Sequence, residues 1–589
     1  MLTTSGVLPK TKGGAFLIED RAPDEIFTAE DLSEQHLAIA RAVDEFWAKE
    51  VDPNLPAILD QQPGVARAVL EKAAELGLAA ISIPEKFGGM ELDLASEVIA
   101  TEHLGRDGSY AGWHSGHTGI GTLPVLYFGS EQQKQKYLPK LANVEMLAAY
   151  ALTEPQAGSD ALAARTRADL TSDGTAYLLN GQKMWITGGG AADLFTVFAK
   201  VGGEKFTAFL VERSFGVKSG AEEQKMGLKG TSTTALYFDN VRVPVENVLG
   251  EIGRGHIIAL NVLNIGRLKL GAAAVGCAKL VLAASLKYAR ERKAFGSAIA
   301  DFGAIQHKLA EMAIRIFAAE SITWRLVGQI EGHLEGFSWD QPDASQTMLK
   351  AVEEFAAECS MVKVFASEML DYVVDEGVQI HGGYGYHHDY AVERAYRDAR
   401  INRIFEGTNE INRLVTAGML LKRAARGQLA LIPAVKKVLD EVLSGPGSTD
   451  ESDDDSRLVA NAKKIALFTI GVAYQRYVDG LDKQQEVVMH IADIVTETFA
   501  MESVFLRARK LAARGKPAIA AEICAVFLRD AMARVEISAR KVLGTCSEGD
   551  ALRMNMTLLR RLARYEPVDD VVLHRRIASR LLARERFIV

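Results

Sequence analysis

Apolar residues recur three and four positions apart over most of this chain, and one central stretch departs from that spacing. From Ser33 to Leu147 the spacing is helical, as in Leu37, Ala40, Val43 and Phe46. Residues 150–248 instead form short alternating or continuous apolar runs bounded by Gly, Asn and Asp, which is typical of strands. Helical spacing returns at residue 257 and continues to residue 425. The pattern predicts a mainly α protein with a central β domain.

The end of the chain carries a further helical segment. A polar and acidic stretch at 444–456 has too few apolar residues to bury a core, and we expect it to be a mobile linker. Beyond it the spacing is helical to the last residue. We therefore expect these parts: an N-terminal arm (1–32), an N-terminal helical domain (33–149), a β-barrel domain (150–256), a helical-bundle domain (257–425), a linker with the acidic stretch (426–456) and a C-terminal helical domain (457–589).

Length and composition narrow the class of protein. A chain of 589 residues is too long for one core, and 48% hydrophobic with 24% charged residues is typical of soluble globular proteins. The N-terminus lacks the layout of a secretory signal, and early acids at Glu19 and Asp20 disfavour an import peptide. No uninterrupted apolar run is long enough to span a bilayer. We expect a cytoplasmic, bacterial enzyme.

The four cysteines form no Cys-x-x-Cys pair, so we predict no metal site.

Charge is distributed unevenly along the chain. Residues 457–589 hold 23 Lys and Arg against 15 Asp and Glu, a net charge of +8, whereas the whole chain carries −8. The runs 560–564 and 575–584 place basic and apolar residues at helical spacing. Such helices can contact anionic lipid at the inner membrane, pair with acids elsewhere on the protein, or form a solvated face, and the sequence leaves all three open. Nucleic acid is not expected, because basic residues and aromatics are not interleaved.

One carboxylate has the setting of a catalytic base. Glu406 follows the apolar pair Ile404-Phe405 and precedes Gly407 and Thr408. Desolvation by the flanking apolar side chains would raise its pKa towards neutrality, and the glycine would let a substrate approach the backbone. The alternative is an ordinary surface acid at the end of a helix, and the spacing alone does not decide between them.

Two further motifs bear on this choice. The stretches Tyr150–Asp160 (YALTEPQAGSD) and Lys183–Gly190 (KMWITGGG), followed by Glu406–Glu410 (EGTNE), stand in an order and at separations that resemble the acyl-CoA dehydrogenase family. The resemblance runs from about Leu37 to Arg423 and is greatest to the very-long-chain type, which has an extra C-terminal helical domain. It implies a helical domain, a small β-barrel and a four-helix bundle, with FAD as cofactor.

The resemblance also implies roles for individual residues. Glu406 would abstract the α-proton of an acyl-CoA thioester, hydride would pass from Cβ to N5 of FAD, and the Glu406 N–H would donate to the thioester oxygen. In a branch of the family the base lies on another helix, at the position of Gly266, which cannot abstract a proton. The implied cofactor contacts are Tyr150, Leu152, Thr153, Gly158, Ser159, Trp185, Ile186, Thr187, Arg292, Phe295, Gln379, Gly382, Gly383, Thr408, Asn409 and Glu410. The implied substrate contacts are Ser159, Asn264, Arg267, Phe405 and Gly407.

Partners follow from the same resemblance. Arg292 would reach the pyrophosphate of a neighbouring subunit's cofactor, so a homodimer or a dimer of dimers is expected. Electrons would pass to electron-transfer flavoprotein. Gly112 and Gly116 would let a long acyl chain run deep between helices, although helix packing could equally require them. We therefore expect dehydrogenation of long-chain acyl-CoA to trans-2-enoyl-CoA in fatty-acid β-oxidation. The alternatives are an acyl-CoA oxidase and a non-catalytic assembly protein on the same fold.

Overall fold

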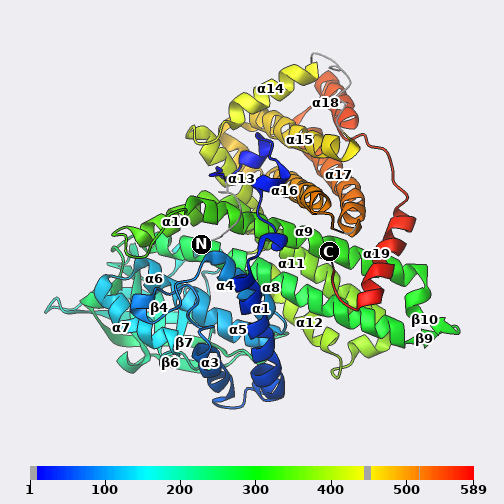
Figure 1. Cartoon of the computed structure of the whole chain (residues 1–589). Helices are drawn as coiled ribbons and strands as arrows, with labels where there is room; N and C mark the ends of the chain where they lie inside the picture. The colour runs from blue at the N-terminus through cyan, green and yellow to red at the C-terminus, as the bar shows by residue number, and fades with distance from the viewer. Residues whose placement is uncertain (1–8, 444–452, 517, 589) are drawn as a thin grey trace.

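The N-terminal domain is a set of capped helices. The computed structural model describes residues 9–443, 453–516 and 518–588 (Figure 1). Ser33 accepts a hydrogen bond from the His36 N–H at the start of the first helix, and Asp93 accepts one from the Ser96 N–H at the start of the fourth, so the chain sets these boundaries locally. The helices are α1 (Glu34–Phe46), α2 (Leu55–Leu59), α3 (Val65–Glu75), α4 (Leu94–Leu104), α5 (Gly108–Ser115), α6 (Leu123–Phe128) and α7 (Glu131–Ala142). Between α5 and α6 lies a π-helical turn, η7 (Gly116–Gly121), a rare geometry that is frequently found at functional sites.

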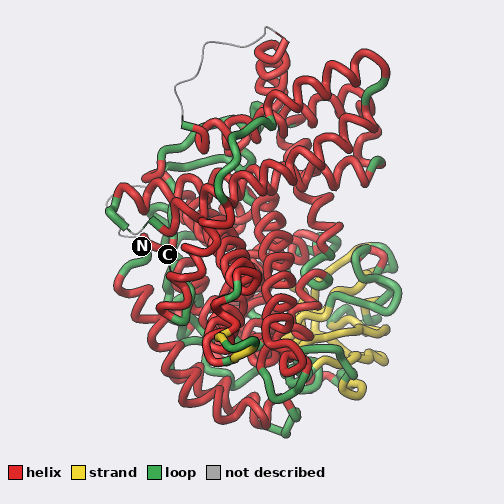
Figure 2. Tube along the Cα trace, turned by 90° about the vertical axis from the view of Figure 1, so that its right-hand side faces the viewer, coloured by secondary structure: helices red, strands yellow, loops and turns green. Residues whose placement is uncertain are grey.

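The middle domain is a single sheet on one side of the molecule (Figure 2). Its strands are β1 (Ala148–Ala151), β2 (Arg167–Leu170), β3 (Ala176–Thr187), β4 (Leu194–Val201), β5 (Lys205–Glu212), β6 (Lys218–Glu222), β7 (Thr233–Pro244) and β8 (Val248–Leu249). The hydrogen-bonded order is β6-β7-β3-β2-β4-β5-β8, with β1 parallel to β4. We expected a barrel, whereas the pairing of the described strands runs from one edge at β6 to another at β8.

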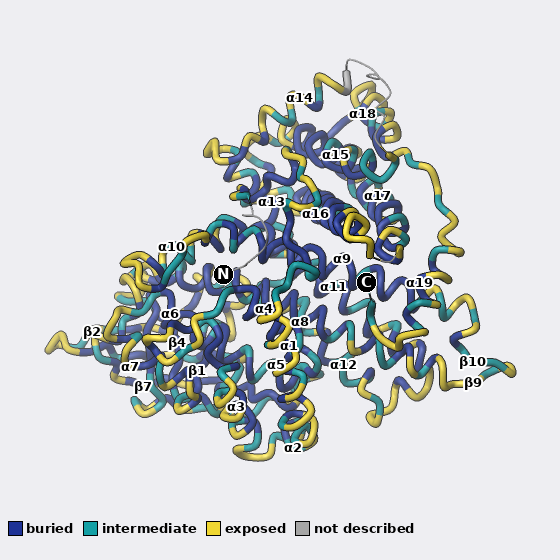
Figure 3. The backbone as a smooth tube through the Cα atoms, in the orientation of Figure 1, coloured by how far each residue is buried: buried dark blue, intermediate teal, exposed yellow. Residues whose placement is uncertain are grey.

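The helical bundle is built from six described α-helices of very different length. They are α8 (Gly255–Glu291), α9 (Gly303–His333), α10 (Ala344–Glu354), α11 (Ala356–His381), α12 (Ala391–Ala399) and α13 (Asn409–Ala425), with a hairpin of β9 (Lys293–Ala294) and β10 (Ser297–Ala298). By length and composition α8 could cross a membrane, although 67% of its apolar window is buried inside the protein. It is packed between α11, α4 and α9, as a core helix would be (Figure 3).

The C-terminal domain packs on the bundle and on the N-terminal arm. It comprises α15 (Asp454–Tyr477), α16 (Gln485–Ala513), α17 (Ile519–Cys546), α18 (Gly549–Leu562) and α19 (Asp570–Arg584). Arm residues Phe16 and Phe27 are buried in the same hydrophobic cluster as α16 and α17. Figure 1 shows the arm (dark blue) beside α13 and α16, and α19 (red) running back along the bundle.

Part of the expected linker is a helix. Residues Leu431–Leu443 form α14, whose Leu431 and Val438 are buried and whose Val435 lies against Gly471 of α15. The prediction of a linker over 426–456 was therefore wrong for this part, because apolar residues at helical spacing were overlooked. Of the acidic stretch expected at 444–456, residues 444–452 lie outside the described residues. Asp453 caps α15 and residues 454–456 form its first turn, so the prediction of a mobile linker was wrong for them.

Many basic residues of the C-terminal domain pair with acids of other parts of the chain. Arg507 contacts Glu30 of the arm and Glu320 of α9, each at 2.6 Å. Arg325 of α9 pairs with Glu502 of α16 at 2.6 Å, and Lys510 lies 2.5 Å from Asp31. These pairs are largely buried, so they connect the domains through groups that would be costly to leave uncompensated. Within the run 575–584, Arg576 and Arg580 pair with Glu522 of α17.

Candidate functional site

Glu406 lies at a strained turn that aims its carboxylate at α8. Its φ is +57°, in the left-handed region that non-glycine residues seldom adopt, and Gly407 follows at φ +80°. A Cβ placed on Gly266 would stand 2.8 Å from Oε2 of Glu406 and 3.1 Å from Oε1. The carboxylate therefore fills the space that a side chain at position 266 would take. Glycine at this position is what allows the acid to lie there.

Glu406 is half-buried as a residue, and Oε2 of its carboxylate is the buried part. Its Oε2 has no hydrogen-bond partner among the described residues. Burial raises its pKa to about 7, while the positive charges of Arg267 and Lys363 act in the opposite direction. We expected Ile404 and Phe405 to desolvate this acid, but both are exposed, at 48% and 39%. The burial comes instead from α8 and the bundle behind it.

Three side chains hold the carbonyl groups of the turn. Arg267 donates to the Glu406 carbonyl at 3.1 Å, and Lys363 of α11 donates to the Gly407 carbonyl at 2.8 Å. Asn412 donates to the carbonyls of Glu406, Gly407 and Thr408 at 3.3, 2.8 and 3.0 Å. Because these carbonyls point into the protein, the backbone of the turn is fixed on its inner side. We infer that the clamp formed by Arg267, Lys363 and Asn412 stabilises the strained backbone of Glu406.

Lys363 and Asn412 were missed by sequence reasoning. Lys363 is fully buried, and burial together with the nearby charge of Arg267 lowers its pKa to about 7. It also donates to Asn409 Oδ1 at 2.7 Å. A lysine inside the apolar run Met361–Phe365 is a signal that could have found it, since an unpaired lysine is very rarely buried.

Arg267 and Asn264 do not lie where we expected them. We predicted that both would contact the substrate. The structure instead buries Arg267 beneath Glu406, with further hydrogen bonds to Asn264 Oδ1 at 3.0 Å and Ser360 Oγ at 3.4 Å. Both residues are therefore positioning residues of the Glu406 turn. A charge so deeply buried is retained only because these acceptors surround it.

The loop after β1 is attached to β3 by a buried ion pair. Lys183 lies 2.7 Å from Glu154 and donates to the Leu152 carbonyl at 3.1 Å. Glu154 also accepts from the N–H groups of Arg165 and Thr166. The Thr153 carbonyl accepts from the Met184 N–H at 2.8 Å. These bonds bring the loop at 152–159 beside the end of β3, so the first two motifs of the sequence form one surface.

Trp185 lies on that surface in an unusual conformation. The β3–β7 register shifts between Lys183 and Ile186, and Trp185 has φ +59° with 54% of its surface exposed. A bulge of this kind redirects a side chain. Ile186 is buried and Thr187 half-buried, so of the three only the indole offers a large free aromatic face.

Tyr150 is buried, and the negative charge of Glu406 raises the pKa of its hydroxyl further. Tyr150 and Glu406 therefore lie in one electrostatic environment.

A second group of predicted residues gathers around the end of α11. Arg292, Gly382 and Gly383 line an open cavity of about 630 Å³, together with Tyr384 and His381. The Arg292 guanidinium lies 5.8 Å from the centre of the Tyr384 ring. Phe295, at the tip of the β9–β10 hairpin, is 97% exposed. A cation, a glycine backbone and aromatic faces therefore meet where the resemblance implied contacts to the cofactor, including its pyrophosphate.

The remaining predicted cofactor contacts differ in how exposed they are and in what they bind. Thr408 caps α13 by accepting from the Ile411 N–H, and Glu410 is exposed. Asn409 is buried, and its side chain is bound to Lys363, Ser367 and Glu368, so it supports the turn from inside. The structure leaves these predicted residues exposed: Gly158, Ser159 and Gln379.

Gly112 and Gly116 are explained by packing. A Cβ on Gly112 would stand 2.6 Å from Thr231 Oγ1, and one on Gly116 would stand 3.0 Å from Thr187 Cγ2. The space that these glycines leave is filled by threonines of the middle domain. Of the two alternatives that the sequence left open for them, the geometry favours packing over an opened acyl channel.

Comparison with known proteins gives the family. Models of the acyl-CoA dehydrogenase N-terminal, middle and C-terminal domains match residues 33–145, 149–241 and 253–421, and a further acyl-CoA dehydrogenase C-terminal domain model matches residues 461–561. A probable acyl-CoA dehydrogenase of Bacillus subtilis (strain 168) is 45% identical over 98% of both chains. The chain belongs to the acyl-CoA dehydrogenase family.

Other members support the same placement. The human mitochondrial very long-chain specific acyl-CoA dehydrogenase is 35% identical, with 82% of this chain and 76% of that protein covered. The crystal structure of an acyl-CoA dehydrogenase complexed with FAD from Bacillus anthracis superposes with a TM-score of 0.96 at 45% identity, covering 98% of this chain and all of that one. The match therefore includes the C-terminal helical domain, and the predicted family and fold class are confirmed.

Proposed function

We propose that this acyl-CoA dehydrogenase family member removes the α-proton and the β-hydride of acyl-CoA thioesters, with Glu406 as the base and FAD as the cofactor. The observation that carries the proposal is the buried Glu406 carboxylate, which has an unpaired oxygen and a pKa near 7. A base with such a pKa is unprotonated in a useful fraction at neutral pH and still binds a proton strongly enough to abstract one. Its geometry beside Gly266 leaves it without a competing acid on α8.

The carboxylate and the backbone N–H of Glu406 have separate roles in the proposed reaction. The Glu406 carboxylate takes the proton from Cα, and the electron pair released there forms the Cα–Cβ double bond as hydride leaves Cβ. The Glu406 N–H donates to the thioester oxygen, where negative charge develops in the transition state. Arg267, Lys363 and Asn412 hold the turn from behind, so the carboxylate does not need to reorganise during the reaction. When bound, FAD supplies the acceptor for the hydride.

The residues that would hold FAD fit its chemistry. The exposed indole of Trp185 can lie against a planar ring system, and Thr153 and Thr187 can hydrogen-bond its edge. Arg292 and the Gly382-Gly383 backbone suit a pyrophosphate and an adenosine. The exposed Phe295 beside Arg292 is the kind of surface that a second subunit covers, so we propose a homodimer that shares cofactor sites across its interface.

Chain length and electron acceptor are finer proposals. We propose a long-chain acyl-CoA substrate, supported by the likeness to the mitochondrial very long-chain specific enzyme and by the C-terminal domain. We also propose electron-transfer flavoprotein as the acceptor, so that the enzyme acts in fatty-acid β-oxidation. An acyl-CoA oxidase would use the same base and flavin and would pass electrons to oxygen. A non-catalytic assembly protein would not need the buried, unpaired carboxylate of Glu406.

The test is a titration of the purified protein. A bound flavin gives a yellow protein, and anaerobic addition of saturated acyl-CoAs from short to very long should bleach it and yield trans-2-enoyl-CoA. Slow reoxidation in air supports a dehydrogenase, and rapid reoxidation with formation of hydrogen peroxide supports an oxidase. Faster bleaching by octanoyl-CoA than by palmitoyl-CoA would overturn the long-chain proposal. Absence of bleaching by every acyl-CoA would overturn the reaction itself.

A further inference from the structure

The turn at 188–192, directly after β3, begins with three consecutive glycines. Gly188 has φ +72°. A Cβ on Gly189 would stand 2.6 Å from Thr234 Oγ1, and one on Gly190 would stand 2.5 Å from Glu222 Oε1, so close packing requires both glycines. Glycine is also the residue type that loses most conformational freedom on folding. A turn of this composition needs contacts from elsewhere in the chain to hold one conformation.

Arg213, between β5 and β6, supplies contacts to the carbonyl groups of the turn. All three nitrogens of its guanidinium donate hydrogen bonds. Nε donates to the Ala192 carbonyl at 2.6 Å, Nη2 to the Gly189 carbonyl at 2.7 Å, and Nη1 to Ser219 Oγ at 2.9 Å. Ser219 Oγ donates to the same Gly189 carbonyl at 2.7 Å. The planar fork of one arginine therefore binds the turn at two points.

Ser232, just before β7, binds the N–H groups of the turn. Its carbonyl accepts from the Gly188 N–H at 2.8 Å, and its Oγ accepts from the Gly190 N–H at 3.1 Å. Glu222 of β6 orients this hydroxyl by accepting from it at 2.6 Å. Arg213 thus binds carbonyl groups of the turn while Ser232 binds its N–H groups, and together they fix its backbone.

The fixed turn sets the end of β3. The Gly189 N–H donates to the Ile186 carbonyl at 2.9 Å, so the conformation of the turn determines the direction of the peptide between Ile186 and Thr187. Thr187 is one of the residues proposed to bond the edge of the flavin. Its half-buried side chain makes no hydrogen bond to any described residue, so its hydroxyl remains for a ligand.

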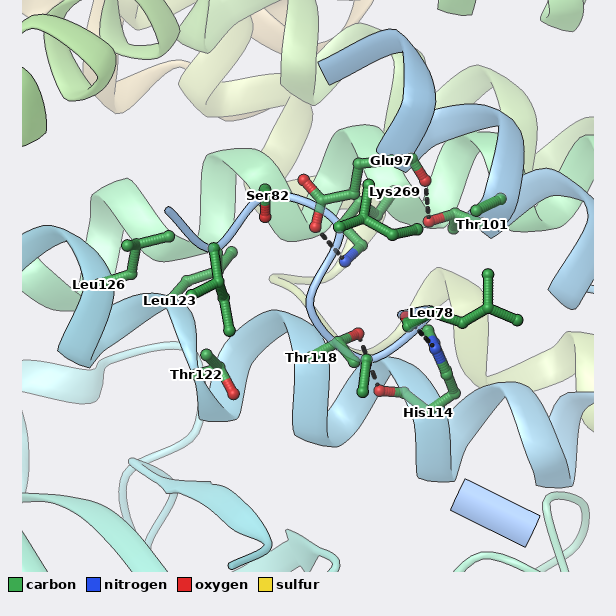
Figure 4. Close-up of a pocket in the computed structure, with 14 residues that line it drawn as sticks. Leu78, Ser82, Glu97, Thr101, His114, Thr118, Thr122, Leu123, Leu126 and Lys269 are labelled. Atoms are coloured by element: carbon green, nitrogen blue, oxygen red, sulfur yellow. Dashed lines mark hydrogen bonds and ion pairs between the residues drawn. The ribbon is translucent and has the colours of Figure 1, made fainter. Parts of the chain in front are cut away.

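The segment that contains α5 and η7 supports Thr187 as well. Thr187 Cγ2 lies 3.0 Å from the position that a Cβ on Gly116 would take. Two hydrogen bonds drawn in Figure 4 anchor this segment: His114 Nε2 donates to the Leu78 carbonyl at 2.9 Å, and Thr118 Oγ1 donates to the His114 carbonyl at 2.9 Å. The methyl group of Thr187 therefore packs on a fixed neighbour.

We propose that Arg213 is a positioning residue for FAD, acting through the turn at 188–192 on Thr187. The proposal rests on the proposed binding of FAD at this surface. Because the turn is already fixed, FAD binding does not have to order its backbone. Without Arg213 the carbonyls of Gly189 and Ala192 lose a charged donor, and the glycines regain conformational freedom. Ordering the backbone of one residue again on binding corresponds to about a tenfold loss of affinity.

The test measures the FAD affinity of the full-length holoenzyme by serial dilution, with free FAD determined after ultrafiltration. Arg213→Met removes the fork and should raise the Kd for FAD about tenfold or more. Arg213→Lys keeps the charge, but one ammonium group does not reproduce the fork, so it should restore the affinity only in part. At saturating FAD the limiting rate of flavin reduction should also fall in Arg213→Met, because the flavin edge is less well placed. The KM for acyl-CoA should not change, because the turn carries none of the proposed substrate contacts.

Arg242→Met is the control. Arg242 lies on β7 at the end of the β3–β7 pairing away from the turn, where it donates to Asp173 and Thr175 at 3.2 and 2.8 Å. This variant should bind FAD as the wild type does. A wild-type Kd and limiting rate in Arg213→Met would overturn the proposal, even with a lower Tm, because Arg213 would then contribute to stability alone.

A second variant decides if Arg213→Met does not fold. Ser219→Ala removes one acceptor of the fork and one donor to Gly189, and leaves the two carbonyl bonds of Arg213 in place. A raised Kd for FAD in Ser219→Ala supports the proposal, and an unchanged Kd then overturns it. The Kd is measured without substrate, so the role of Arg213 is tested even if no acyl-CoA bleaches the wild-type flavin and the proposed reaction fails. If the wild-type protein binds no FAD, both proposals fall.

Discussion

Replacing Gly266 by alanine should impair the reaction without unfolding the protein. The added Cβ would stand 2.8 Å from Oε2 of Glu406, and ordinary contact begins at 3.4 Å, so the carboxylate must retreat by about 0.6 Å. A displacement of this size at a reacting group costs on the order of 10- to 100-fold in rate. The free energy of unfolding should not fall, because the atoms that must move are the end of a flexible side chain. Alanine also favours a helix over glycine by up to about 1 kcal/mol.

The assay is stopped-flow reduction of the flavin by acyl-CoA, with thermal unfolding measured on the same preparations. Gly418→Ala on α13 is the matched control, since a Cβ there meets nothing within 4 Å. The control should reduce its flavin at the wild-type rate. A Gly266→Ala enzyme that also reacts at the wild-type rate would refute the reasoning, because the carboxylate would then work equally well from a displaced position.

Four further results are expected. Flavin reduction should accelerate as pH rises through about 7, because the Glu406 carboxyl must lose its proton to act as a base. The pKa of this acid is raised on folding, so Glu406 costs stability as pH rises above its unfolded value of 4.5, and Glu406→Gln should raise the Tm at pH 8 more than at pH 5. Lys363→Met removes a positive charge that holds the pKa of Glu406 down, so the midpoint of the pH–rate profile should move to higher pH; an unchanged midpoint would exclude this role. Arg292→Ala should lose FAD during gel filtration, measured by absorbance, whereas Lys287→Ala, an exposed cation on α8, should keep it; equal retention would contradict the phosphate site.

The sequence predicted those features that depend on neighbouring residues. Helical and strand spacing predicted a mainly helical chain with a central β domain, and the setting of Glu406 before Gly407 and Thr408 indicated a candidate base. The missed elements have other causes. Helix α14 lies just before the acidic stretch, and the two were predicted together as one linker. Apolar residues of α14 such as Leu431 and Val438 are nevertheless buried.

The contacts of the clamp beneath Glu406 could not be predicted from local pattern, although the buried Lys363 itself has a local signal. Lys363 is hydrogen-bonded to Gly407, which is 44 residues away in the sequence, and Arg267 to Glu406, which is 139 residues away. Both contacts therefore exist only after α8, α11 and the turn have packed together. The same holds for Gly112 and Gly116, whose partners Thr231 and Thr187 belong to another domain. Such pairs are set by tertiary structure, which periodicity does not encode.

The central claim is that the Glu406 carboxylate abstracts the α-proton. It is tested most directly by mixing the Glu406→Gln protein anaerobically with a saturated acyl-CoA and following the flavin absorbance. We predict a yellow protein that still binds the thioester and is not bleached, while Glu353→Gln, which alters an exposed acid of α10, is bleached as the wild type is. Bleaching of the Glu406→Gln protein at the wild-type rate would contradict the account.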